Sequence, residues 1–109
     1  MMSDENDAAF FWDVATPFLA DEAVSKGTMM GFPCLRVNGD FFASADYRSG
    51  DLIVKLPADR VLALIDEGDG EPFSPNGRRF REWVRVVERD AGRWETLIAE
   101  AETFVSTKV

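Results

Sequence analysis

Apolar and polar residues recur with two different periods along this chain, and the change of period separates helical from extended segments. Between Ala8 and Leu19 the apolar residues fall near helical spacing, which predicts a helix with an aromatic face packed inward. Pro17 is expected to end or kink this helix near Thr16, or to start a short second segment there. Residues 1–7 are polar and predict a frayed lead-in to a single domain that spans residues 8–109.

Residues 25–56 show instead the period-two pattern of half-buried strands. The dipeptide Asn38-Gly39 is typical of a type I′ hairpin turn, in which both central residues need a positive φ. The next strand is expected to place Phe41, Ala43 and Ala45 on one face, and Phe42 and Ser44 on the other. A further strand is expected to have Leu52, Val54 and Leu56 on one side. These segments predict an antiparallel β-meander.

Two more helices and one more strand are predicted in the second half of the chain. The first of these helices begins at Pro57 and ends at Gly68, and its expected buried stripe is Val61, Leu62, Leu64 and Ile65. A loop rich in glycine, proline and acidic residues follows, pinned by Phe73. Residues 80–87 predict a strand in which Val84 and Val86 face away from Trp83 and Arg85.

The final helix has the clearest periodicity. Asp90 is its expected N-cap, and its apolar positions share one face: Trp94, Leu97, Ile98, Ala101, Phe104 and Val105. Together these elements predict an α+β, two-layer fold in which helices at both ends flank an antiparallel β-meander.

Composition narrows the functional classes. The 109 residues carry a net charge of −8, which does not suit a non-specific nucleic-acid binder. Histidine is absent, which excludes Ser-His and Cys-His nucleophile arrangements and histidine metal ligands. The single cysteine allows no internal disulfide. We expect no signal peptide, because the first residues are acidic where a signal peptide would be basic, and the sequence has no apolar stretch of membrane-spanning length. We therefore expect a soluble cytoplasmic protein with no membrane partner.

Few residues suggest a metal, cofactor or catalytic site, and we expect none of the three. The acidic run at residues 66–71 fails the EF-hand pattern because its third and fifth positions are Gly68 and Gly70, so we interpret it as a solvated loop. Cys34 is expected to be a buried structural thiol. Lys55 either contacts an anion near the start of the following helix or lies at a sheet edge.

Basic residues cluster in one part of the chain. Residues 78–93 hold six arginines and have a net charge of +3, whereas residues 1–77 have a net charge of −9. If residues 80–87 form a strand, one face of the segment presents Arg79, Arg81, Trp83 and Arg85. With Arg78 and Lys55 these residues form a candidate surface for an anionic partner or a nucleic acid. The alternative is that the arginines pair with carboxylates of their own domain, for example on the preceding loop.

Several short motifs occur in an order and at a spacing that resemble one known family. They are Met29-Met30-Gly31-Phe32, the Asn38-Gly39 hairpin, Phe41-Phe42-Ala43, Val54-Lys55-Leu56-Pro57, Pro72-Phe73 with Pro75 and Gly77, and Glu82-Trp83-Val84. Over most of its length the chain resembles the MmcQ/YjbR-like proteins and the related N-terminal domain of TfoX (Sxy) proteins. The resemblance implies an antiparallel sheet flanked by helices in a double-wing arrangement. It also implies a DNA-binding or competence-regulator-like role, with no catalytic residues to carry over.

Three classes of function follow. The first, favoured by the resemblance, is a small non-enzymatic regulatory or DNA-binding domain. The second is an acidic protein-interaction module, as a homodimer or with another protein, which uses the aromatics Phe10, Phe11 and Trp12 or the arginine surface. The third is an enzyme or small-molecule binder built on acidic residues, Lys, Arg or Tyr47, for which no constellation of catalytic residues is recognisable.

Overall fold

The computed structural model describes residues 3–29, 31–46, 48–74 and 77–107, in which two helices are followed by four strands, a helix, two strands and a final helix. The helices are α1 (Ser3–Ala15), the 3-10 helix η1 (Thr16–Ala20), α2 (Ala58–Asp66) and α3 (Ala91–Ser106). The strands are β1 (Val24–Met29), β2 (Phe32–Val37), β3 (Asp40–Ala45), β4 (Leu52–Lys55), β5 (Glu71–Pro72) and β6 (Trp83–Val86). Met30, Tyr47 and Pro75, which entered the motifs and candidates above, lie outside the described residues.

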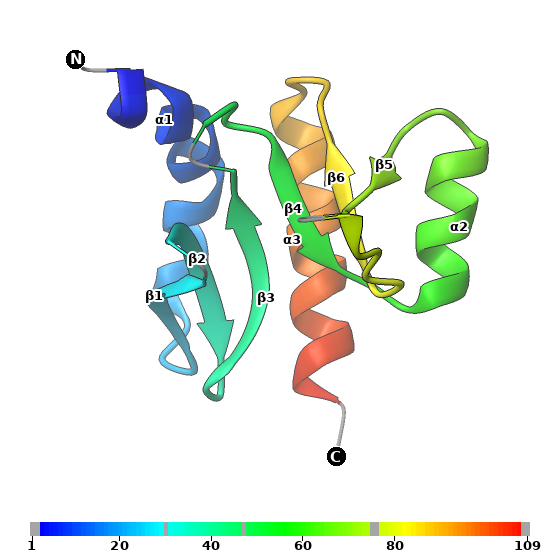
Figure 1. Ribbon diagram of the computed structural model, residues 1–109. Helices are drawn as coiled ribbons and strands as arrows, with labels where there is room; N and C mark the ends of the chain where they lie inside the picture. Colours follow the sequence, from blue (N-terminus) through cyan, green and yellow to red (C-terminus); the bar gives the residue numbers. More distant parts are fainter. Residues whose placement is uncertain (1–2, 30, 47, 75–76, 108–109) are drawn as a thin grey trace.

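The strands form one antiparallel sheet with the order β1-β2-β3-β4-β6-β5. Helices α1 and α3 lie together against one face of this sheet, and α2 lies at its far end, next to β5 and β6 (Figure 1). The prediction of an α+β fold with an antiparallel sheet flanked by helices is confirmed. None of the described helices is long and apolar enough to cross a bilayer.

The main hydrophobic core lies between the sheet and the helices. Leu52, Val54 and Leu56 are fully buried there, as their spacing predicted. The predicted face of α3 enters the same core through Trp94, Leu97, Ile98, Ala101 and Val105, and Phe104 packs at its margin. Asp90 is the N-cap, because its carboxylate accepts the Arg93 N–H at 3.0 Å.

The hairpin between β2 and β3 has the predicted turn but an unpredicted bulge. Asn38 and Gly39 have φ values of 54° and 90°, as a type I′ turn requires. Leu35 pairs with Ala43, whereas Arg36 pairs with Phe41, so Phe42 is an extra residue on its strand. The predicted faces are therefore wrong in part, because the bulge sends Phe42 into the main core.

Helix α1 begins at Ser3, so residues 3–7, which we expected to be frayed, form its first turns. Neither glycine nor proline interrupts the sequence between Ser3 and Ala15. The helix ends one residue before Thr16, and Pro17 stands in the first turn of η1, as the sequence predicted.

The three consecutive aromatics of α1 are used inside the domain. Phe11 is fully buried, and the Phe10 ring meets the Trp94 ring edge-on with 4.7 Å between centroids. Trp12 is half-buried, with Lys26 Nζ 5.0 Å from its ring centroid. All three aromatic side chains of α1 thus contact the domain, and Phe10 and Trp12 remain partly exposed at the margin of the core.

The second face of the sheet carries a small aromatic cluster instead of a helix layer. Phe32, Ile53 and Phe73 are buried in it, and Phe80 and Trp83 pack against them. The Phe73 and Phe80 rings stack with 5.9 Å between centroids, so the loop after β5 folds back onto the sheet. Phe73 therefore pins this loop, as predicted.

A close approach between α2, the following loop and β6 gives a test of the packing. A Cβ added to Gly70 would lie 2.7 Å from Val84 Cγ2 and 3.4 Å from Leu64 Cβ. We expect Gly70→Ala to lower the free energy of unfolding by about 1 to 3 kcal/mol in urea denaturation, because this region is already filled.

Gly92 provides the control for that substitution. A Cβ there meets only Asp90 Oδ1, at 3.7 Å, within the first turn of α3. Gly92→Ala should therefore raise the free energy of unfolding by up to about 1 kcal/mol. Equal effects of the two substitutions would show that the space around Gly70 is not filled by its neighbours.

Candidate functional site

The predicted arginine face is not a single strand face. Strand β6 covers only Trp83–Val86, and residues 81 and 82 form a turn before it. The Phe80 N–H donates to the Phe73 carbonyl at 3.0 Å and the Trp83 N–H donates to the Phe80 carbonyl at 3.2 Å, so the backbone turns there instead of extending. Trp83 and Arg85 share a face of β6, opposite Val84 and Val86 as predicted, but Arg79 and Arg81 lie outside the strand.

Arg85 is held inside the domain by two carboxylates. Its guanidinium donates to Asp46 Oδ2 and to Asp51 Oδ2, each at 2.9 Å, and both aspartates are buried. Burial raises the pKa of Asp46, but the Arg48 N–H and the Arg85 guanidinium outweigh it, so the pKa lies below its ordinary 3.8. This ion-pair network connects the turn between β3 and β4 to strand β6.

Two further arginines of the basic segment also pair within the domain. Arg89 donates to Asp51 Oδ1 at 2.8 Å and to the Ser49 carbonyl at 2.7 Å, which extends the same network. Arg93 lies 3.1 Å from Asp69 on the loop before β5. For these residues the structure matches the interpretation in which the arginines neutralise carboxylates of their own chain.

Lys55 and Trp83 lie opposite each other on paired strands. Strand β4 lies inside the sheet, so the expectation that Lys55 lies at a sheet edge is wrong. Its Nζ is 3.9 Å from Glu82 Oε1 and 5.9 Å from the Trp83 ring centroid. Both side chains are thus engaged with neighbours, and Trp83 packs on the aromatic cluster.

The remaining arginines, Arg78, Arg79 and Arg81, are exposed on the loop before β6. Arg78 lies over the Phe80 ring, 5.7 Å from its centroid. Within the described part of the chain, no hydrogen bond, ion pair or ring contact engages Arg79 or Arg81. These two cations are therefore available to another molecule.

Arg79 and Arg81 line a cavity of about 460 Å³ together with Ala58 and Leu62 of α2. We call these four residues the α2 groove. The Leu56 N–H donates to the Glu82 carbonyl at 2.9 Å, which holds the arginine loop beside the start of α2. The groove combines two guanidinium groups, which suit carboxylate or phosphate oxygens, with an aliphatic wall.

Leu62 was predicted to be buried and is not. Its exposed fraction is 52%, whereas Val61 and Leu64 are fully buried and Ile65 packs at the core margin. The four apolar residues span about 160° of the helix circumference, and Leu62 lies at one margin of that arc, next to Ala58 four residues earlier. That spacing is the sequence signal that could have revealed the groove.

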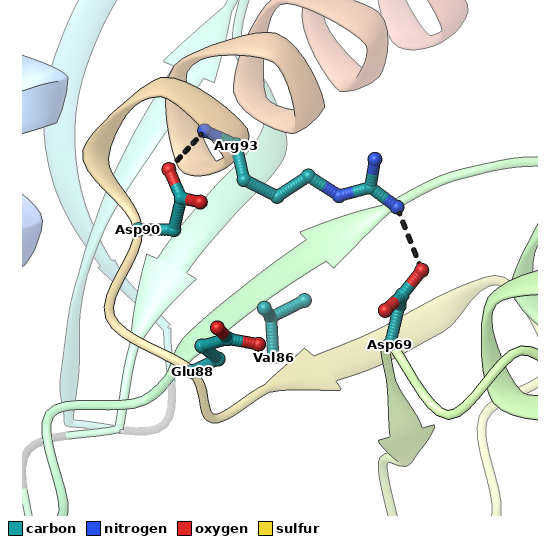
Figure 2. A pocket seen from close by; sticks show the side chains of 5 residues that line it. All are labelled: Asp69, Val86, Glu88, Asp90 and Arg93. Atoms are coloured by element: carbon teal, nitrogen blue, oxygen red, sulfur yellow. Dashed lines mark hydrogen bonds and ion pairs between the residues drawn. The ribbon is translucent and has the colours of Figure 1, made fainter.

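A second cavity lies between the start of α3 and the loop before β5, with a volume of about 230 Å³ (Figure 2). Three carboxylates line it, from Asp69, Glu88 and Asp90. Arg93 reaches across it to Asp69, and the Asp90 carboxylate is occupied as the cap of α3. Among the described residues no group of three metal-binding side chains is arranged to hold an ion.

Cys34 lies on β2 and is fully buried. Burial raises the pKa of its thiol to about 11, despite the opposing charge of Arg36. The thiol is therefore protonated at neutral pH and lacks the thiolate character of a reactive cysteine, which agrees with the predicted structural role.

Comparison with known proteins adds no assignment. No family model matches the chain, and no curated protein or solved structure matches it significantly. The likeness to MmcQ/YjbR-like and TfoX (Sxy) proteins therefore stays a prediction from the motifs.

Proposed function

We propose that this chain is a non-enzymatic protein-interaction module that binds its partner through the α2 groove. The observation that carries the proposal is the contrast between two groups of arginines. Arg85, Arg89 and Arg93 pair with aspartates of the domain, whereas Arg79 and Arg81 remain exposed beside an exposed leucine. An exposed apolar residue flanked by arginines that have no partner among the described residues is typical of a protein-binding surface, where arginine is enriched.

DNA binding is the second candidate, and the motif resemblance favours it. The finer proposal that the fold is of the MmcQ/YjbR-like, double-wing type belongs with it. The exposed loop of Arg78, Arg79 and Arg81 would supply the phosphate contacts. We rank it second because the net charge of −8 repels DNA phosphates and only three clustered arginines oppose that repulsion. The other three arginines of the segment pair with aspartates of the domain.

The two candidate functions predict different results in two experiments, one that measures binding of labelled duplex DNA and one that uses the immobilised chain to retain a partner protein. We expect no binding of random or genomic duplex at about 50 mM salt and micromolar protein, where non-specific DNA binders are bound. We expect the immobilised chain to retain a partner protein that, once purified, binds the chain again. The Arg79→Ala/Arg81→Ala variant should not retain this partner. Arg48→Ala/Arg93→Ala is the matched control, because it removes the same charge from exposed positions elsewhere. DNA binding that the groove variant abolishes would replace this proposal with the second candidate.

A further inference from the structure

The chemistry of the α2 groove specifies the kind of segment that fits it. We infer that the groove binds an acidic peptide segment in which carboxylate side chains flank an aliphatic one. This inference rests on the proposed function and adds the identity of the partner surface to it. Each half of the recognition follows from different residues of the groove.

The acidic half follows from Arg79 and Arg81. Both residues line the cavity, and neither side chain has a partner within the described residues. The neighbouring carboxylate of Glu82 lies 3.9 Å from Lys55 Nζ and pairs with that lysine. The guanidinium groups of Arg79 and Arg81 thus have no carboxylate partner among the described residues and can pair with carboxylates of another molecule.

The aliphatic half follows from Ala58 and Leu62. These residues lie four apart, on one side of α2, and line the cavity together with the arginines. Leu62 is one of two large apolar side chains that the described surface exposes, and it lies within the cavity instead of standing alone. Covering it with an aliphatic side chain removes apolar surface from water, which a polar or purely acidic segment cannot do.

The size of the cavity matches a short extended segment. A volume of about 460 Å³ is in the range of ligand-binding clefts and holds a few side chains. Along an extended peptide, successive side chains point to opposite sides and every second one shares a side. A segment that alternates Leu with Asp or Glu can therefore present its carboxylates and its aliphatic groups to different walls of the groove.

Fluorescence anisotropy with three labelled twelve-residue peptides tests the inference. The first alternates Leu with Glu and Asp, the second has Ser in place of Leu, and the third has Lys in place of the acidic residues. We expect the first to bind, the second to bind about fivefold to tenfold more weakly, and the third not to bind. Binding of the second peptide as tight as the first would show that charge alone is recognised and would overturn the inference.

Groove variants localise the binding. Arg79→Ala/Arg81→Ala should weaken the first peptide by about tenfold, and Leu62→Ser by about fivefold. The control Arg48→Ala/Arg93→Ala, which has the same net charge as the double groove variant, should bind as the unchanged protein does. Circular dichroism of each variant confirms that it is folded. Equal weakening in the control would overturn the inference, because attraction would then be non-specific.

Other results separate this inference from the proposed function. No binding of the first peptide at about 1 mM would overturn the inference, while retention of a protein partner would leave the proposed function standing. Self-association that Leu62→Asp abolishes would assign the groove to a second copy of the chain, again overturning only the inference. Duplex DNA binding that Arg79→Ala/Arg81→Ala abolishes would overturn both.

Discussion

Replacing Trp94 with alanine is expected to lower the free energy of unfolding by about 3 to 5 kcal/mol, a large part of the stability of a small domain. Trp94 is fully buried in the main core, where the edge-on ring of Phe10 contacts it. Its Nε1–H donates to the Glu88 carbonyl at 2.7 Å. Alanine therefore opens a large cavity and leaves that carbonyl without its donor.

Thermal and urea denaturation followed by circular dichroism measure this effect. Trp94→Phe keeps most of the ring packing and is expected to cost less, about 1 to 3 kcal/mol, so it remains informative if the alanine variant does not fold. Trp12→Ala is the comparison. Because Trp12 is only half-buried, its substitution should lower the free energy of unfolding by less than Trp94→Ala does. A Trp94→Ala protein as stable as Trp12→Ala would contradict the position of Trp94 at the centre of the core.

Replacing Arg85 with alanine is expected to lower the free energy of unfolding at pH 7 by about 3 kcal/mol. The substitution leaves the carboxylates of Asp46 and Asp51 buried without the guanidinium that they share. Arg89 replaces none of the lost contact to Asp46, because it pairs only with Asp51. Urea denaturation measures the loss. Arg93→Ala is the control, because Arg93 and Asp69 form an exposed pair whose removal should cost less than about 1 kcal/mol.

The same network sets a dependence on pH. Asp46 and Asp51 have pKa values below the ordinary 3.8, so their contribution to stability is present above that pH and is lost as the pH falls through the lowered values. Without Arg85, burial acts on Asp46 with less opposition and its pKa rises. The difference between the unchanged protein and Arg85→Ala should therefore shrink as the pH falls below about 4. A difference that stays constant down to pH 2 would exclude these carboxylates as its source.

Much of the fold could be predicted because it depends on local patterns. Asn38-Gly39 specifies its turn through backbone conformations that few residue pairs adopt. The apolar face and the Asp90 cap of α3 are separated by fixed helical spacings. The bulge at Phe42 broke the period-two prediction, because an added residue changes the face of a strand without changing its composition.

The candidate site was less accessible to sequence reasoning because its contacts are long-range. Nothing near Arg85 in the sequence indicates that its partners lie at positions 46 and 51, which are 39 and 34 residues away. Arg79 and Arg81 were predicted to lie on a strand, but they lie on the loop before β6, which the Phe73–Phe80 stack stabilises. The exposed position of Leu62 depends on where α2 packs, which the helical pattern alone leaves open.

The order of the strands also has a consequence for how copies of the domain behave at high concentration. The sheet ends on one side at β5, which has only two residues, and on the other side at β1, which has six. A long terminal strand is a template on which further chains can add, and a charged side chain along it opposes such growth. Lys26 is exposed in the middle of β1. We therefore expect its charge to oppose the addition of further chains to β1 and so to oppose fibril formation.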